Sequence, residues 1–262
     1  MRRLPAVWRV LGALLLGLVA LRAIVELTPA ERPPGGPRSS TFATGPDGLA
    51  AYADLLVRSG REVRRERSRL SDATLDPTAV LFVVDPLAVR TDDADALARF
   101  VDAGGTLVAS GQTADRWLRA LLPAPQRARP GDGPGGLVVP LAPVPEVAGV
   151  ARVAASGAAL DVGDGTTLLP VLGDGSRVAA GVATAGAGRV LVLADGSPLW
   201  NGLLAHEDNA AFGLALVPAG RRAVFAEEPH GYGRATGLGA VPRSFLVALA
   251  GVALAVLLLY AG

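Results

Sequence analysis

The feature that most constrains this chain is a long apolar run at its C-terminal end. Residues 244–262 (SFLVALAGVALAVLLLYAG) carry no charge, and their most polar side chains are Ser244 and Tyr260. About 20 apolar residues in a helix cross the hydrocarbon core of a bilayer, and a helix that is apolar on every face is typical of a membrane span or of a deeply buried core. The length and the flanking Arg243 favour the first of these, so the run predicts a transmembrane helix over residues 244–262.

A second apolar run lies near the N-terminus and is shorter. Residues 10–21 are apolar, and Arg22 interrupts the run before residues 23–25 resume it. An arginine near the end of a span can extend its side chain to the membrane surface, so we expect an uncleaved transmembrane helix over residues 10–27. A cleaved signal peptide is the alternative, because a short apolar run also suits the central region of such a peptide.

The charges beside the two runs predict an orientation. The tail of residues 1–9 carries three arginines, and short basic tails stay in the cytoplasm under the positive-inside rule. Arg234 and Arg243, before the second run, argue the other way. We expect a two-pass protein of the cell membrane whose central domain lies outside the cytoplasm, with the lipid bilayer as a partner.

Composition excludes several classes of function. The net charge is +1, so the chain offers no general basic surface, and we expect no nucleic-acid partner. Cysteine is absent, which excludes disulfides, thiolate metal sites and a cysteine nucleophile. Only two histidines occur, and neither lies in a spacing that is typical of a metal site. We expect no cofactor and no bound metal.

Between the two apolar runs, the sequence alternates helix and strand patterns. A Pro- and Gly-rich stretch over residues 28–40 is typical of a linker, and the folded part is expected over residues 41–226. Continuous β-prone runs predict buried strands, and apolar residues three and four apart predict helices. The expected strands are 79–84, 106–109, 189–194 and 223–226, and the expected helices are 46–59, 91–103, 114–122 and 203–217.

One stretch breaks this alternation. Residues 123–188 contain a Pro-rich loop and then short β-like runs, which Gly-Asp-Gly turn signals separate. Strand–helix–strand units outside this stretch pair in parallel with right-handed crossovers. The sequence therefore predicts an α/β fold: an open, mostly parallel sheet with a β-rich insertion, flanked by two transmembrane helices. Residues 227–243 are expected to form a loop beside the membrane.

Several segments resemble one bacterial family. The telling pieces are Gly104-Gly105 before a strand, and residues 195–201 (DGSPLWN) followed by Asp208-Asn209. With these motifs the chain resembles the family called domain of unknown function 4350 over nearly its whole length. The resemblance implies a divergent class I glutamine-amidotransferase-like, or flavodoxin-like, fold held between membrane helices, and no established activity. The resemblance also implies a gene neighbourhood, in which members of this family are encoded beside MoxR-type AAA ATPases. This neighbourhood implies a protein partner in an envelope-associated complex.

The position after the strand at 106–109 bears on catalysis. Amidotransferase chemistry needs a cysteine at a strand-to-helix elbow and a histidine to activate it. Ser110 stands at that position, while Val108 and Gln112 replace the glycines that a strained nucleophile turn requires. We therefore expect a non-catalytic domain. The alternative is a serine-type hydrolase that uses Ser110 with His206 or His230 as its base.

Polar residues follow three of the expected strands. Ligands of parallel sheets bind at the carboxyl ends of the strands, so these side chains are candidates for a ligand site. The candidates are Asp85, Ser110, Asp195, Ser197 and Asn201. A role in turns and helix caps is the alternative for each of them. The sequence thus predicts non-catalytic binding of a ligand or partner, and a purely structural subunit of a membrane complex is the third hypothesis.

Overall fold

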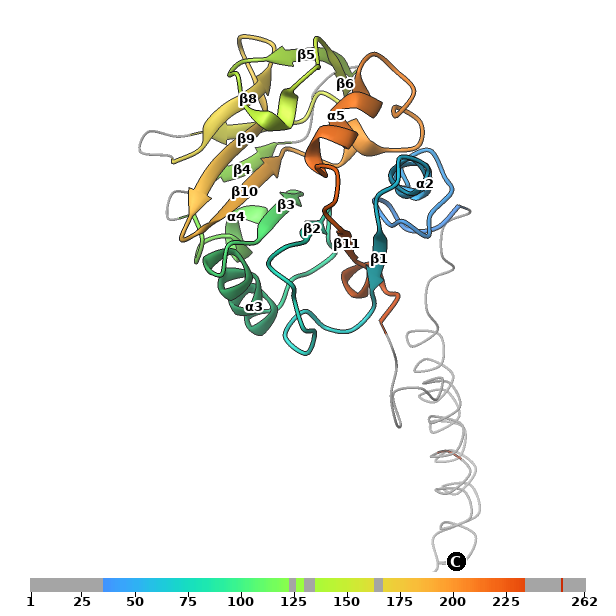
Figure 1. The fold of residues 1–262 in the computed structure, drawn as a ribbon, viewed down its shortest axis with the longest axis vertical. Coiled ribbons are helices and arrows are strands. Elements are labelled where there is room, and N and C mark those ends of the chain that lie inside the picture. Colours follow the sequence, from blue (N-terminus) through green and yellow to red (C-terminus); the bar gives the residue numbers. More distant parts are fainter. Residues whose placement is uncertain (1–34, 123–125, 130–134, 163–166, 234–250, 252–262) are drawn as a thin grey trace, which may run out of the picture. The chain divides into compact units, whose positions relative to one another are not determined.

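The computed structural model describes residues 35–122, 126–129, 135–162, 167–233 and Gly251. Pro33–Gly233 form one compact unit, and Figure 1 shows it built around a twisted sheet. The strands of this sheet are β1 (Val63–Glu66), β2 (Val80–Val83), β3 (Thr106–Ser110), β4 (Gln126–Arg129), β5 (Gly136–Pro140), β6 (Val153–Ala155), β7 (Ala159–Val162), β8 (Leu169–Gly173), β9 (Val178–Ala185), β10 (Gly188–Leu193) and β11 (Ala223–Ala226). The helices are α2 (Ala50–Arg58), α3 (Thr91–Asp102), α4 (Ala114–Trp117) and α5 (Asn209–Leu216), and short 3-10 turns are η1 (Pro145–Val147), η2 (Ser197–Leu199) and η3 (Glu228–His230).

Five strands form a parallel half in the order β1-β11-β2-β3-β10. Thr106 of β3 pairs with Val80 of β2 on one side and with Arg189 of β10 on the other. The runs expected as strands at 79–84, 106–109 and 189–194 are therefore parallel neighbours. Their carboxyl ends meet at one edge of the sheet, which is where a ligand site is expected.

The other half of the sheet is antiparallel, and it corrects the predicted fold class. β9 pairs antiparallel with β10, and β8, β5 and β6 extend the sheet outward in the same manner. β7 joins β9 and β4 in antiparallel pairs as well. The prediction of a mostly parallel sheet is wrong, because the hairpins of residues 123–188 continue the main sheet. The fold is a mixed sheet with 11 strands and four helices within the described residues.

The prediction of flanking membrane helices is contradicted as well. Within the described residues, no helix is long and apolar enough to cross a membrane. The described helices therefore do not supply the two transmembrane helices of the predicted fold class and of the predicted two-pass location in a cell membrane. The predicted spans themselves, 10–27 and 244–262, lie outside the described residues except for Gly251.

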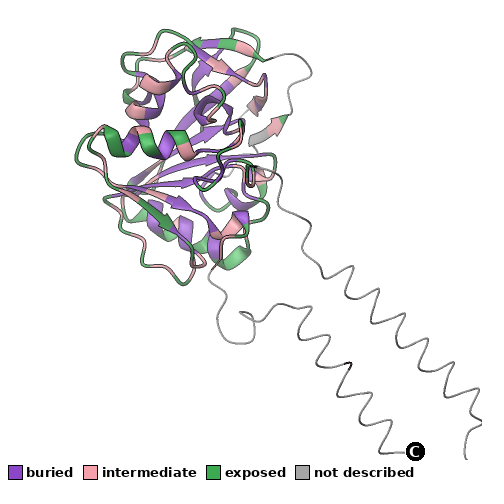
Figure 2. Cartoon of the chain, turned by 90° about the vertical axis from the view of Figure 1, so that its right-hand side faces the viewer, coloured by how far each residue is buried: buried purple, intermediate pink, exposed green. Residues whose placement is uncertain are grey.

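Two apolar layers cover the two faces of the sheet. Side chains alternate along β2, so that Phe82 joins the layer under α2 and α5 while Leu81 joins the layer under α3 and α4. Figure 1 shows α2 and α3 on opposite sides of the central strands, and Figure 2 shows the strands between them as buried. Phe82 stacks on Phe225 with ring centroids 4.6 Å apart, and Tyr52 of α2 meets both rings edge-on. Such aromatic pairs add about 0.5–1.5 kcal/mol to the stabilisation from burial.

The segment before α2 packs onto the sheet as part of the core. Ser39, Ser40 and Thr41 are buried, although part of this stretch was expected to be linker. Glu227, which follows β11, accepts hydrogen bonds from the hydroxyls of Ser40 and Thr41, both at 2.5 Å. These contacts fasten the segment to the carboxyl edge of the parallel strands.

Candidate functional site

A pocket of about 550 Å³ lies at the carboxyl ends of β2, β3 and β10. This volume falls within the range of small-molecule sites in proteins, about 300–1,000 Å³. Two of the five residues predicted from sequence, Asp85 and Asp195, line it. The charged and strongly polar side chains of its wall are Arg38, Asp85, Gln112, Arg129, Asp195 and His230.

Asp85 is the centre of the polar network beside the pocket. Its Oδ2 atom accepts hydrogen bonds from the Ser39 hydroxyl at 2.6 Å and from the backbone N–H of Gly196 at 2.9 Å. Its Oδ1 atom accepts the Ser110 hydroxyl at 2.8 Å. Burial raises the pKa of Asp85 above its usual value, and the nearby charge of Asp195 raises it further, while the hydrogen bonds act in the opposite direction. One carboxyl group thus joins the ends of three strands and the segment before α2.

The backbone at this network is held in an uncommon conformation. Ser39 and Asp85 have positive φ angles of 55° and 45°, a region that residues other than glycine enter at a cost of about 1–3 kcal/mol. Trp200 supports the arrangement, because its indole Nε1–H donates to the Ser39 hydroxyl at 2.8 Å. Backbone strain of this kind is common at functional sites, so the pocket is a candidate for such a site.

Asp195 forms a second carboxylate on the same wall. Its Oδ1 atom accepts the backbone N–H of Ser197 at 3.0 Å and the Ser197 hydroxyl at 2.5 Å. Its Oδ2 atom accepts the Ser156 hydroxyl, and the Ser197 hydroxyl in turn accepts the Ser156 N–H at 2.9 Å. Ser197 is fully buried, so it positions Asp195 and leaves contact with a ligand to the carboxylate.

Ser110 is hydrogen-bonded to Asp85 and to neither histidine within the described residues. Ser110 is fully buried, and its hydroxyl donates to Asp85 Oδ1 while it accepts the Asp85 N–H at 3.0 Å. His206 is exposed in the turns before α5. Among the hydrogen bonds of the described residues, none joins Ser110 to His206 or to His230.

His230 lies in the pocket wall, which the sequence did not reveal. The sequence predicts a loop beside the membrane for this stretch; in the structure His230 ends the 3-10 turn η3, and its imidazole is buried and lines the pocket. Burial lowers the pKa of His230, while the charge of Glu227 and a hydrogen bond to the backbone of Val84 oppose that shift. A neutral imidazole that donates through one nitrogen offers the other as an acceptor.

Asn201 serves the fold instead of the pocket. Its side-chain oxygen accepts the N–H of Ala51 at 2.8 Å, and its Nδ2 atom donates to the carbonyls of Ala43 and Gly45 at 3.0 and 2.7 Å. All three partners lie before or at the start of α2. Asn201 therefore holds that segment in place, which is the structural alternative stated for it from sequence.

Two arginines of the wall were also missed by sequence reasoning. The guanidinium of Arg38 lies 4.3 Å from the centre of the Trp200 ring. Arg129 forms an ion pair with Asp161 on the neighbouring strand β7. The stretch that holds Arg38 has the composition of a linker, and no local pattern marks either residue. Only the tertiary fold brings them to the carboxylates.

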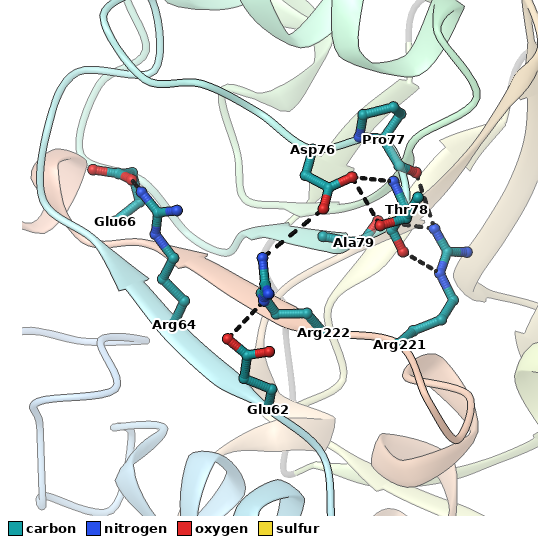
Figure 3. Close-up of polar contacts among 9 residues, drawn as sticks. All are labelled: Glu62, Arg64, Glu66, Asp76, Pro77, Thr78, Ala79, Arg221 and Arg222. Atoms are coloured by element: carbon teal, nitrogen blue, oxygen red, sulfur yellow. Dashed lines mark hydrogen bonds and ion pairs between the residues drawn. The ribbon is translucent and has the colours of Figure 1, made fainter.

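A second polar cluster lies at the opposite edge of the sheet, where β2 and β11 begin (Figure 3). Arg221 donates to the backbone carbonyls of residues 77–79. Arg222 lies 2.8 Å from Glu62 and 3.9 Å from Asp76. The cavity beside them measures about 20 Å³, which is room for about one water molecule. This cluster fastens the loop before β2 and offers no space for a ligand.

The chain can be assigned to a family once this geometry is known. The sequence profile described as "Domain of unknown function (DUF4350)" matches residues 41–217. The chain belongs to this family. The match confirms the family that the sequence motifs resemble, and it does not confirm the implied amidotransferase-like character or membrane anchoring. No protein with a curated description matches the chain.

Several solved structures match parts of this chain at low sequence identity. The β-galactosidase from Bacillus circulans sp. alkalophilus is 13% identical with a TM-score of 0.36, over 45% of this chain and 20% of that one. The cold-adapted β-galactosidase from Rahnella sp. R3 is 16% identical with a TM-score of 0.42, over 55% and 22%. A cytoplasmic protein from Salmonella typhimurium LT2 is 16% identical with a TM-score of 0.45, over 62% and 83%. This chain spans about a fifth of the length of the two β-galactosidases, and we carry no activity over from these structures.

Proposed function

We propose that this domain binds a small polar ligand rich in hydrogen-bond donors, and that it does so without chemical turnover. The pocket at the carboxyl edge of the parallel strands is the proposed site. The observation that carries the proposal is the pair of carboxylates, Asp85 and Asp195, which the network beside the pocket holds in fixed positions.

The two carboxylates have acceptor capacity left for a ligand. A carboxylate offers about four acceptor positions. Asp85 uses three of them, for Ser39, Gly196 and Ser110, among the described residues. Asp195 also uses three in the described part of the chain, two for Ser197 and one for Ser156. One remaining acceptor on each, together with a neutral imidazole, suits a ligand with several hydroxyl or amino groups.

The state of Ser110 supports binding without turnover. A serine acts as a nucleophile only when a base takes its proton and its oxygen can reach the substrate. Here the hydroxyl is fully buried and donates to Asp85. A carboxyl group that holds three strand ends together serves as a structural acceptor, and this role leaves Ser110 as part of the support for the pocket.

The proposal is tested by calorimetric titration of the full chain with glucose, glycerol and their acid and phosphate derivatives. We expect saturable binding of at least one compound, and we expect Asp195→Asn to weaken it about tenfold or more, because hydrogen bonds to charged groups contribute about 1.5–3 kcal/mol. Asparagine keeps the shape and the Ser197 contacts while replacing one acceptor with a donor. Asp54→Asn is the matched control, since Asp54 is exposed on α2. Absence of binding to every compound overturns the proposal.

Partner binding is a second candidate, and one surface favours it. Leu137, Val139 and Leu141 follow the alternation of β5, and each is between 41% and 46% exposed. We propose that this stripe contacts a protein, and the family resemblance makes a MoxR-type AAA ATPase the partner to test. Co-elution of the two purified proteins that Val139→Arg abolishes would support this role. Separate elution of the unaltered proteins would overturn it.

A further inference from the structure

We infer that Arg38 forms an anion-binding subsite at this pocket, so that the ligand is a hydroxylated compound with one carboxylate or phosphate group. The inference rests on the proposed function and names the class of ligand. Neither the family description nor the structural comparisons assign such a site.

The guanidinium of Arg38 is held in a defined position. It lies 4.3 Å from the centre of the Trp200 ring, a distance at which a cation is attracted to an aromatic face. Trp200 is fixed in turn, because its Nε1–H donates to Ser39, whose hydroxyl donates to Asp85. An arginine stacked on a ring keeps the N–H groups at the edge of its plane available for an oxyanion.

Arg38 is also the arginine of the pocket wall whose guanidinium is not held in an ion pair within the described residues. Among the described residues, no carboxylate forms an ion pair with Arg38, whereas Arg129 is paired with Asp161. Planar guanidinium groups bind carboxylate and phosphate oxygens through two parallel hydrogen bonds. An anionic group on the ligand would therefore find its partner at Arg38.

The charges of the pocket fix the direction in which such a ligand binds. Asp85 and Asp195 share one wall, and their free acceptor positions attract hydroxyl groups. Arg38 attracts the opposite end of the molecule. A compound with an anionic group at one end and hydroxyl groups along its chain satisfies both parts of the pocket, and a neutral polyol satisfies only the carboxylates.

The test compares matched ligands and matched variants by calorimetry on the full chain. We expect gluconate or glucose 6-phosphate to bind about tenfold or more tightly than glucose, as a charged hydrogen-bonded pair implies. The two anions show whether the subsite takes carboxylate or phosphate. Arg38→Gln is expected to remove this preference, so that the variant binds the anions no more tightly than it binds glucose. Arg129→Gln is the control and is expected to keep the preference, because Arg129 is already paired.

The outcomes separate this inference from the proposed function. If glucose and the anions bind equally and Arg38→Gln changes nothing, the pocket is a ligand site and the anion subsite is wrong. The subsite is also wrong if Arg129→Gln removes the preference and Arg38→Gln keeps it. If none of these compounds binds, both proposals are overturned. Thermal unfolding of each variant shows whether it is folded, and Arg38, whose side chain lies at the surface, is expected to be replaceable without loss of stability.

Discussion

Replacement of Gly196 by alanine tests the tightness of the network around Asp85. The backbone of Gly196 has a φ of −75°, which any residue adopts, so the effect of a methyl group there is purely steric. A Cβ atom would lie 2.7 Å from Ser39 Oγ, 2.8 Å from Asp85 Oδ2 and 2.6 Å from Val84 Cγ1. Contacts this short require the neighbours to move, and these neighbours are buried and hydrogen-bonded.

The expected cost follows from the bonds that must change. The Gly196 N–H and the Ser39 hydroxyl both donate to Asp85 Oδ2, and intramolecular hydrogen bonds contribute about 0.5–1.5 kcal/mol each. Overpacking by one methyl group costs about 1–3 kcal/mol. Since the network can relax in part, we expect Gly196→Ala to lower the free energy of unfolding by about 2–5 kcal/mol.

Urea denaturation followed by tryptophan fluorescence measures this loss. Gly136→Ala is the control: the nearest atom to a Cβ atom there lies at 3.7 Å, and its φ is not positive, so we expect a change within about 1 kcal/mol. The Gly196→Ala variant is also expected to lose affinity for the pocket ligand. If Gly196→Ala is as stable as Gly136→Ala, the network is loose and the reasoning about Asp85 is refuted.

Three further predictions concern the carboxylate, the core and the serine. The raised pKa of Asp85 means that the folded state holds the carboxyl proton to a higher pH than the unfolded state, in which the pKa of Asp is about 3.9. The protonated carboxyl therefore stabilises the folded state fully below a pH of about 3.9, and this stabilisation is lost as pH rises through the folded pKa of Asp85. The free energy of unfolding of the wild type minus that of Asp85→Asn should therefore fall as pH rises above about 4, and a difference that rises with pH would show that the carboxyl is stabilised in its charged form. Phe82→Ala should cost about 3–5 kcal/mol in urea denaturation, because Phe82 is buried and stacked on Phe225; a loss below 1 kcal/mol would contradict the packing described. Ser110 should not react with a fluorophosphonate probe, and labelling that disappears in Ser110→Ala would establish the hydrolase alternative.

The parallel half of the sheet could be predicted from sequence because its signals are local. Residues 79–84 are a continuous apolar run that a strand buried on both faces requires, and Gly104 ends α3 with a positive φ of 100°. The antiparallel half could not be predicted in full. The turn before β9 is visible in the sequence, but no local pattern shows that β9 pairs with β10. That choice of neighbour depends on contacts between distant segments.

The candidate site was predicted only in part, because local signals mark some of its residues and contacts between distant segments place the others. Asp85 and Asp195 directly follow apolar strands, so the general rule for parallel sheets places them at one edge. Asn201 lies in the same stretch after β10 as Asp195, yet its side chain donates hydrogen bonds to the segment before α2. Arg38 and His230 reach the pocket from the two ends of the folded unit. Their positions depend on how those ends pack, which residue spacing does not reveal.

The central claim is that the pocket beside Asp85 and Asp195 binds a ligand, and the indole N–H resonance of Trp200 tests it most directly. This group donates to Ser39 within the network, and its ring lies under the guanidinium of Arg38. In a titration of the full chain with gluconate, we expect the Trp200 resonance to shift and saturate, and we expect Asp195→Asn to need about tenfold or more gluconate for the same shift. A Trp200 resonance that stays unchanged through saturating concentrations of gluconate, glucose and glucose 6-phosphate would contradict the claim.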